Sequence, residues 1–260
     1  MDTSLLLIDM KDGIARLTIN SPKSLNALNS RVLRELEGAL DALDGDDEVK
    51  VVVLTGAGDK AFVAGADIKE MAAMNAFEGQ QFGLQGQRVM LRMEKMRKPV
   101  IAAVNGYALG GGLELALACD FIYASEKARL GFPEVTLGII PGFGGTQNLA
   151  RRIGAARASE LIFTGRMIEA HKARDWGIVN EVCAPEELLA KAMETAAAIA
   201  AVGTLGVAYA KNAIVNGLNM GKEDGFRYEA SLFGVLFATE DQKEGMGAFV
   251  EKRKSAFKGK

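Results

Sequence analysis

Histidine and cysteine are scarce in this sequence. His171 is the only histidine among 260 residues, and the two cysteines, Cys119 and Cys183, both lie in apolar runs. A structural or catalytic metal site usually needs several histidine or cysteine ligands, and a disulfide framework needs a set of spaced cysteines. No bound metal is therefore expected, and both thiols are interpreted as reduced core residues.

Nucleophilic triads also lack support. His171 lies in Ile168–Lys172, which is typical of an exposed helix start, and no Gly-x-Ser-x-Gly motif occurs.

An excess of positive charge is absent as well. The 31 Lys and Arg residues are balanced by 33 Asp and Glu residues, which gives a net charge of −2 and a pI near 5.7. Binding to nucleic acid or to an anionic membrane surface is therefore not indicated.

No long hydrophobic run is uninterrupted. The longest weakly charged stretch, 99–118, contains Asn105, three consecutive glycines and Glu114, which a membrane helix would not carry. The N-terminal residues 1–4 show no basic segment or leader. We expect a soluble, cytoplasmic protein.

Glycine and apolar residues are abundant. Thirty glycines are spread among hydrophobic segments, and 49% of the residues are apolar, so tight turns around a sizeable core are expected. Short β-branched or alternating runs predict strands at 14–19, 51–54, 100–104 and 120–124. A helix capped by Ser30 is predicted from leucines at helical spacing, and helices dominate after about Gly144, the last two at 223–237 and 241–254. The fold class is α/β, without a linker or a short-period repeat.

A glycine triplet, Gly110–Gly112, lies between the predicted strand 100–104 and a helical run, Leu113–Cys119. The dinucleotide-binding motif fails because Leu115 occupies the position of its third glycine, and no Gly-Lys-Ser/Thr follows for a phosphate loop. Glycines at a helix N-terminus expose N–H groups that favour an oxyanion. A tight strand-to-helix crossing is the plainer alternative.

Two glutamates are the strongest candidates for catalytic residues. Glu114 falls in the first turn of that helix among leucines, where it either faces solvent or is a buried acid. Glu134 follows Pro133 in an apolar segment. Two buried carboxyls close together cannot both ionise cheaply, so one acts as base and the other as acid. Together with exposed N–H groups in Ala61–Lys69, they would suit the addition of water to an activated double bond.

These segments together resemble the crotonase (enoyl-CoA hydratase/isomerase) family, especially its short-chain enoyl-CoA hydratases. The matching motifs are 17–22, 64–71, 103–106, 110–114, 133–134, 141–147 and 249–254, which span nearly the whole chain. The resemblance implies a spiral of ββα units with two roughly perpendicular sheets. It implies a core with the active site at residues 1–200 and a C-terminal helical region, 201–260, that forms trimers or dimers of trimers (hexamers).

The resemblance also implies roles for individual residues. The backbone N–H groups of Ala66 and Gly111 would hold the thioester oxygen. Glu114 would act as the base on the attacking water, and Glu134 would deliver a proton to Cα. Gly142 would let a backbone N–H reach the site.

Contacts with the CoA portion of the substrate would come from Ala64, Asp67, Ile68 and Lys69, and from Phe233 and Lys252 on a neighbouring helix. Phe132 stands where the family often has Gln, so it is predicted to narrow or reshape the acyl pocket, whose far end would be formed by Met71–Phe82.

The implied function is reversible hydration of a trans-2-enoyl-CoA, most simply a short-chain one in fatty acid β-oxidation, with no cofactor besides the CoA of the acyl-CoA substrate. Isomerases of this family generally need only one of the two carboxylates, so the presence of both favours hydration. An isomerase, a hydratase of an unusual acyl group such as a cyclic dienoyl thioester, and an RNA-binding protein on the same fold remain alternatives.

Overall fold

The computed structural model describes residues 4–260 and contains two β-sheets. The expectation of no leader at residues 1–4 falls mostly on residues 1–3, which lie outside the described part. The larger sheet has the order β1 (Leu6–Lys11), β2 (Ile14–Ile19), β3 (Val51–Gly56), β5 (Val100–Val104), β7 (Phe121–Ser125) and β10 (Glu181–Cys183). Only β1 is antiparallel to its neighbour. The smaller sheet has the order β4 (Ala61–Val63), β6 (Tyr107–Leu109), β8 (Arg129–Gly131) and β9 (Met167–Glu169).

The chain crosses repeatedly from the larger sheet to the smaller one. Strands β3, β5 and β7 belong to the larger sheet, and β4, β6 and β8, which follow each of them directly, belong to the smaller one. Helices α1 (Ser30–Gly45), α3 (Ala76–Lys95) and α4 (Gly111–Leu117) follow successive strand pairs. The spiral of ββα units expected from the sequence is therefore present.

Close backbone packing makes the crossings sharp. A Cβ atom on Gly106 would lie 2.2 Å from the carbonyl oxygen of Lys60, so only glycine fits there. The side chain of Asn105 donates hydrogen bonds of 3.0 Å and 2.9 Å to the carbonyl oxygens of Gly56 and Gly58. Two neighbouring crossings are thereby joined.

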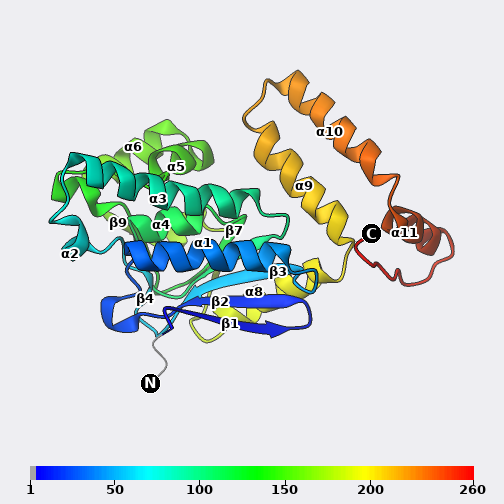
Figure 1. Cartoon of the computed structure of the whole chain (residues 1–260), viewed down its shortest axis with the longest axis horizontal. Coiled ribbons are helices and arrows are strands. Elements are labelled where there is room, and N and C mark those ends of the chain that lie inside the picture. The colour runs from blue at the N-terminus through cyan, green and yellow to red at the C-terminus, as the bar shows by residue number, and fades with distance from the viewer. Residues whose placement is uncertain (1–3) are drawn as a thin grey trace.

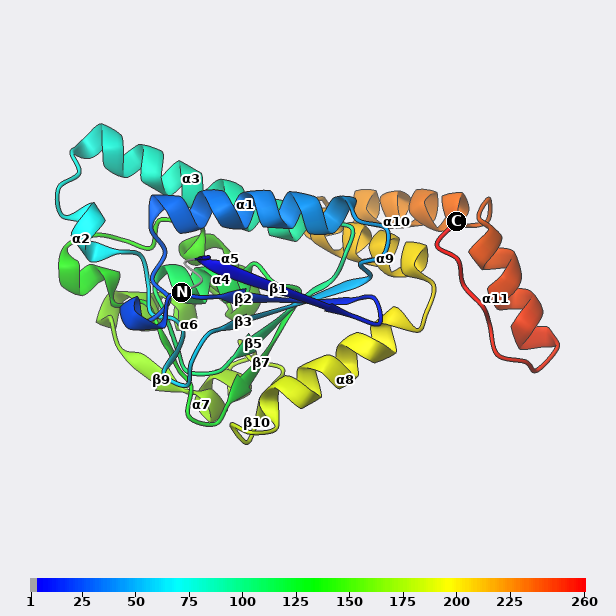
Figure 2. The ribbon, with the colours of Figure 1, turned by 60° about the horizontal axis from the view of Figure 1, so that its bottom comes forward.

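The parallel strands of the larger sheet are buried on both faces, as their continuous apolar sequences predict. Val52, Leu54 and Ala102 belong to the main core with α1 and α3, whereas Val53 and Ile101 pack with α8 (Leu188–Ala200). Figures 1 and 2 show α1 and α3 on one side of this sheet and α8 on the other. Asn29, rather than the predicted Ser30, caps α1, because its side chain accepts from Val32 N at 2.8 Å.

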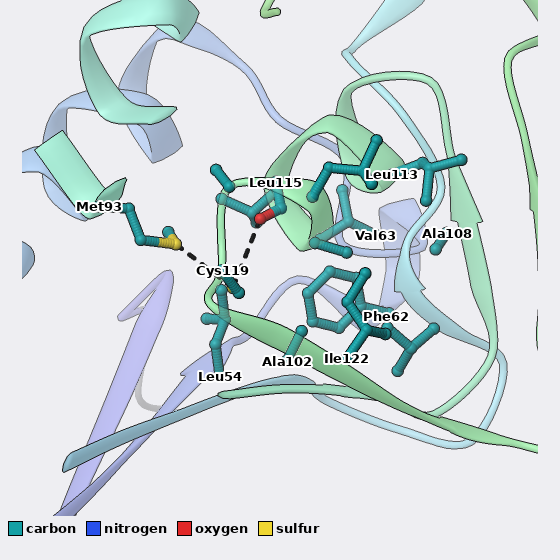
Figure 3. Close-up of a cluster of buried hydrophobic side chains, with 14 of the residues drawn as sticks. Leu54, Phe62, Val63, Met93, Ala102, Ala108, Leu113, Leu115, Cys119 and Ile122 are labelled. Atoms are coloured by element: carbon teal, nitrogen blue, oxygen red, sulfur yellow. Dashed lines mark hydrogen bonds between the residues drawn. The ribbon is translucent and has the colours of Figure 1, made fainter. Parts of the chain in front are cut away.

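Helix α4 is embedded in the main core, since all seven of its residues are buried. Figure 3 shows Leu113 and Leu115 among side chains from both sheets, with the Cys119 thiol directed towards Met93 Sδ at 3.3 Å and the Leu115 carbonyl oxygen at 3.5 Å. Both cysteines are buried and free, as predicted.

The second half of the described chain is mainly helical. It contains α5 (Gly145–Ile153), α6 (Ala155–Thr164), α7 (Ala170–Asp175), α8, α9 (Thr204–Gly217), α10 (Lys222–Leu236) and α11 (Glu240–Val250). Two short elements near the site, α2 (Ile68–Met71) and the 3-10 helix η2 (Pro133–Leu137), complete the part that matters for function.

Helices α9, α10 and α11 extend away from the sheets, with α9 and α10 side by side (Figures 1 and 2). Taken singly, none of the helices within residues 4–260 is long and apolar enough to cross a membrane; α8 and α9 would qualify only as a pair, which is bent by 107°.

Candidate active site

A cavity of about 660 Å³ contains both predicted glutamates. Its walls come from the 64–66 loop, α2, α3, the N-terminus of α4, η2 and the loop 138–143. The crossings between the two sheets place these segments together although they are far apart in the sequence. The carboxyls of Glu114 and Glu134 and the backbone of Ala66 and Gly111 all line this one cavity.

Glu114 is held rigidly at the inner wall of the cavity. Its position in the first turn of α4 fixes the backbone, and the residue is only 2% exposed. One carboxylate oxygen, Oε1, accepts hydrogen bonds from the backbone N–H groups of Phe143 at 2.8 Å and Gly145 at 2.7 Å. Burial raises the pKa of this carboxyl to about 7; the Gly145 hydrogen bond opposes the rise, the charge of Glu134 adds to it, and the Phe143 hydrogen bond opposes it.

Glu134 lies in the first turn of η2, and its carboxyl rests against Gly110. Gly110 has φ +50°, and a Cβ atom there would lie 2.5 Å from Oε1 of Glu134, so glycine is required for both reasons. The other oxygen, Oε2, is buried and has no hydrogen-bond partner within residues 4–260. Burial raises the pKa of Glu134 to about 7 as well, against a lowering by its own backbone N–H.

Two backbone N–H groups meet beside these carboxyls. A Cβ atom on Gly111 would lie 3.5 Å from the backbone nitrogen of Ala66, so the two residues are immediate neighbours. Gly111 is the first residue of α4, and the hydrogen bonds around Ala66 are made by Gly65 O and Asp67 N instead. Neither Ala66 N nor Gly111 N therefore donates a hydrogen bond to any described residue, and such a pair can stabilise an oxyanion.

Some of the predicted CoA-contacting residues lie at the cavity. Ala64 and Ile68 line it, whereas Asp67 caps α2 by accepting from Lys69 N at 2.9 Å. Lys69 is exposed on α2 outside the lining. Gly142 lines the cavity too.

Phe132 is placed differently from the prediction. Its side chain is fully buried and does not line the cavity. It lies beside Glu114 and Gly145 instead. A Cβ atom on Gly145 would lie 2.6 Å from Phe132 Cε1 and 2.9 Å from Glu114 Cγ, so the three residues are packed together. The prediction that Phe132 narrows the acyl pocket directly is therefore wrong, because the residue is packed into the core.

Phe233 and Lys252 are remote from the cavity within one chain. Phe233 is on α10 and lines a separate apolar depression with residues of α9 and α11, and Lys252 follows α11. Figure 1 shows these helices at the opposite end of the molecule from α2. Their predicted contact with CoA would require a second copy of the chain.

Sequence reasoning missed two residues of the site, Phe143 and Gly145. Their N–H groups orient Glu114 across 29 and 31 positions of sequence. The glycines of 141–146 are the signal that could have indicated exposed N–H groups here, but they do not reveal the acceptor to which those groups point.

Comparison with known proteins agrees with this fold. The family model described as enoyl-CoA hydratase/isomerase matches residues 9–260. The chain therefore belongs to the enoyl-CoA hydratase/isomerase family.

The names of similar proteins specify an activity within this family. The chain is 48% identical to a short-chain-enoyl-CoA hydratase of Clostridium acetobutylicum, over 98% of this chain and 97% of that protein. It is also 48% identical to a crotonyl-CoA hydratase of Syntrophomonas wolfei, over 97% of each chain. The crystal structure of an enoyl-CoA hydratase from Bacillus anthracis superposes with a TM-score of 0.96 at 43% identity, covering 99% of this chain and 100% of that one.

Proposed function

We infer that this protein is an enoyl-CoA hydratase, a carbon–oxygen lyase that reversibly adds water to a trans-2-enoyl-CoA to give a 3-hydroxyacyl-CoA. The observation that carries the inference is the presence of Glu114 and Glu134 in one cavity beside the unpaired N–H groups of Ala66 and Gly111. The high identity to named hydratases over nearly full length supports the same reaction.

The geometry indicates which residue takes part in each step of the reaction. The thioester makes Cβ electrophilic, and attack by water builds negative charge on the carbonyl oxygen. The N–H groups of Ala66 and Gly111 stabilise that charge, and one such donor is worth roughly 2.7–4 kcal/mol in known oxyanion sites. Glu114, fixed by two N–H groups, removes the proton from the attacking water, and Glu134 supplies a proton to Cα.

Both carboxyls have pKa values raised to about 7, so near neutral pH the pair readily holds a single proton. One base and one acid are then available together. This division needs no redox cofactor or metal in the mechanism.

We propose further that the substrate is a short-chain acyl-CoA, as the names of the relatives suggest, and that the protein acts in the cytoplasm on intermediates of fatty acid β-oxidation. The backbone of Ala64 and the side chain of Ile68 would lie along the CoA portion, with Asp67 and Lys69 at its outer end. Phe233 and Lys252 would reach it from another subunit of a trimer or hexamer.

The test is the loss of the conjugated thioester absorbance of crotonyl-CoA with the purified protein. Glu114→Gln and Glu134→Gln are each expected to lower kcat at least 10²-fold, because each removes one half of the proton transfer. The double variant should lose much less than the product of the two single losses, since both groups act on one water. Near-wild-type hydration by either single variant would contradict the assignment.

Two parallel measurements separate the alternatives. A 3-enoyl-CoA converted faster than crotonyl-CoA is hydrated would identify an isomerase. Salt-sensitive retention on RNA, with no turnover of either thioester, would identify an RNA-binding protein.

A further inference from the structure

One face of α3 holds the loop that orients Glu114. Three residues of this face meet residues 142–143 of that loop. A Cβ atom on Gly83 would lie 3.6 Å from the carbonyl oxygen of Gly142, and Gln87 Nε2 donates a 2.9 Å hydrogen bond to the same oxygen. Gly86, between them, faces the ring of Phe143.

The contact at Gly86 leaves no space for any side chain. A Cβ atom there would lie 2.1 Å from Cδ1 and 2.3 Å from Cγ of Phe143, far inside contact distance. Phe143 is buried, and its other edge faces a second glycine, Gly111, 3.2 Å from the position that a Cβ atom would take there. The ring is thus packed between two glycines. Phe82 packs edge-on against the same ring, with the centroids 5.2 Å apart.

The position of the Phe143 ring affects the Glu114 carboxyl through the backbone of Phe143. Its N–H donates to Glu114 Oε1 at 2.8 Å, so a displaced ring moves one of the two donors that orient Glu114. We propose that Gly86 is a positioning residue for the reaction. Because it has no side chain, the Phe143 ring can pack directly against α3, and Phe143 in turn holds Glu114 in the geometry that removes a proton from water. The proposal rests on the hydratase function inferred above.

The direct test is Gly86→Ala, measured for crotonyl-CoA hydration between pH 5 and 9. A misplacement on the order of 1 Å costs about 10²-fold in rate, so kcat should fall roughly 10- to 100-fold with little change in KM. The acid limb of the pH profile should move to higher pH, because the Phe143 hydrogen bond lowers the pKa of Glu114 and its loss raises that pKa. Glu134 is the charged group whose field reaches Glu114, and it is unaltered.

Rescue distinguishes positioning from a general loss of stability. Phe143→Ala removes the ring but keeps the N–H, so adding Gly86→Ala in that background should cost less than threefold and leave the acid limb unmoved. Gly38→Ala is the matched control: Gly38 is exposed in α1 with nothing within 4 Å of its Cβ position, so rate and profile should be those of the wild type.

Gln87→Ala provides a milder variant in case Gly86→Ala does not fold. It removes the hydrogen bond to Gly142 O without introducing a clash, and the acid limb should move in the same direction by a smaller amount. An equal cost of Gly86→Ala in both backgrounds would overturn the proposal. So would unchanged profiles in both Gly86→Ala and Gln87→Ala. Failure of the wild type to hydrate crotonyl-CoA would overturn the proposed function instead.

Discussion

Glu114 and Glu134 place two ionisable groups at the wall of one cavity, Glu114 buried and Glu134 half-buried. Glu114 is compensated by hydrogen bonds from Phe143 N and Gly145 N, whereas Glu134 Oε2 has none from the described residues. Burying a carboxylate with incomplete compensation is costly to the fold, and such costs concentrate at functional sites. The same arrangement keeps both groups able to exchange protons near neutral pH.

A stability prediction follows from Glu114. Its pKa is raised from 4.5 to about 7, so its contribution to stability is fully present below about pH 4.5 and is lost as the pH rises through about 7. Glu114→Gln removes the buried charge and keeps an oxygen to accept from both N–H groups. At pH 9 the variant should therefore be more stable than the wild type by up to about 3 kcal/mol, relative to their difference at pH 4.

Thermal unfolding followed across that pH range measures the difference. Glu48→Gln, at an exposed position after α1, serves as the matched control and should follow the wild type. A gap between Glu114→Gln and the wild type that stays constant with pH would show that Glu114 is not the buried titrating group.

Among the elements, α3 both builds the cavity wall and limits the cavity. Gly79 lines the cavity in the first turn of α3, and nothing lies within 4 Å of its Cβ position. Met71 and Met74 line the cavity nearby, whereas Met90, Met93 and Met96 fill the core. The segment 71–82 thus contributes to the cavity wall, and its predicted position at the far end of the acyl pocket stays a prediction.

We expect kcat/KM to be highest for acyl chains of about four to six carbons and to fall steadily with length, because the segment 71–82 limits the space for the chain. A methylene in a hydrophobic pocket is worth only about 1–3 kcal/mol, so the fall should be graded and not absolute. The Cβ position of Gly79 is open, so Gly79→Leu should fill part of the cavity and steepen the fall, leaving crotonyl-CoA least affected. The measurement is kcat/KM across a series of straight-chain enoyl-CoAs. Wild-type turnover of a twelve-carbon substrate equal to that of crotonyl-CoA would rule out a short-chain enzyme.

Helix α9 is joined to the core by a buried ion pair. Lys211 Nζ donates to Asp120 Oδ2 at 2.9 Å and to the carbonyl oxygens of Met93 and Lys98 at 3.1 Å and 3.2 Å. The Lys211 side chain is 5% exposed, and Asp120 also accepts from Val100 N. This pair fixes where the C-terminal helices leave the core.

Lys211→Met should destabilise the fold by about 2–4 kcal/mol, because it leaves the Asp120 charge partly buried and unpaired. Denaturant unfolding measures the loss. Adding Asp120→Asn removes that charge and should recover part of the stability, since the penalty lies in the unpaired partner. An additive double variant would show that the ion pair does not couple α9 to the core.

At the scale of the whole molecule, the C-terminal helices expose more apolar surface than a solitary chain would normally leave. Phe226 and Phe233 on α10 are each 63% exposed, Phe249 is 85% exposed, and α10 has no buried residue. Exposed apolar surface of this kind typically marks subunit interfaces. Together with the remote positions of Phe233 and Lys252, this surface favours an assembly in which the C-terminal helices of one copy reach the cavity of another.

We therefore expect a trimer or hexamer by light scattering at micromolar concentration. Phe226→Asp combined with Phe249→Asp should shift the protein towards monomer, because charges would enter the apolar contact. Arg174→Asp, at an exposed site on α7, is a control that should keep the oligomer. A wild-type monomer at that concentration would contradict the expectation.

Local patterns determined much of the fold. The runs Ile14–Ile19 and Val100–Val104 are strands with the predicted bounds, because alternation and β-branched residues act within a few positions. The boundaries of helices were less well determined. Helix α4 begins at Gly111, inside the glycine triplet, and α11 ends at Val250 rather than 254, before Lys252 takes a left-handed backbone with φ +56°.

The sequence alone indicated Glu114 and Glu134 from their motifs, and the family resemblance added the backbone N–H groups of Ala66 and Gly111 as expected oxyanion donors. The surroundings of these groups depend on how distant segments pack together. The donors to Glu114 come from Phe143 and Gly145, and Phe132 turned inward to the core. The contact of Gly86 with Phe143 depends on how α3 packs against a loop more than fifty residues later. Packing of this kind is set by the whole core at once, so no local stretch of sequence encodes it.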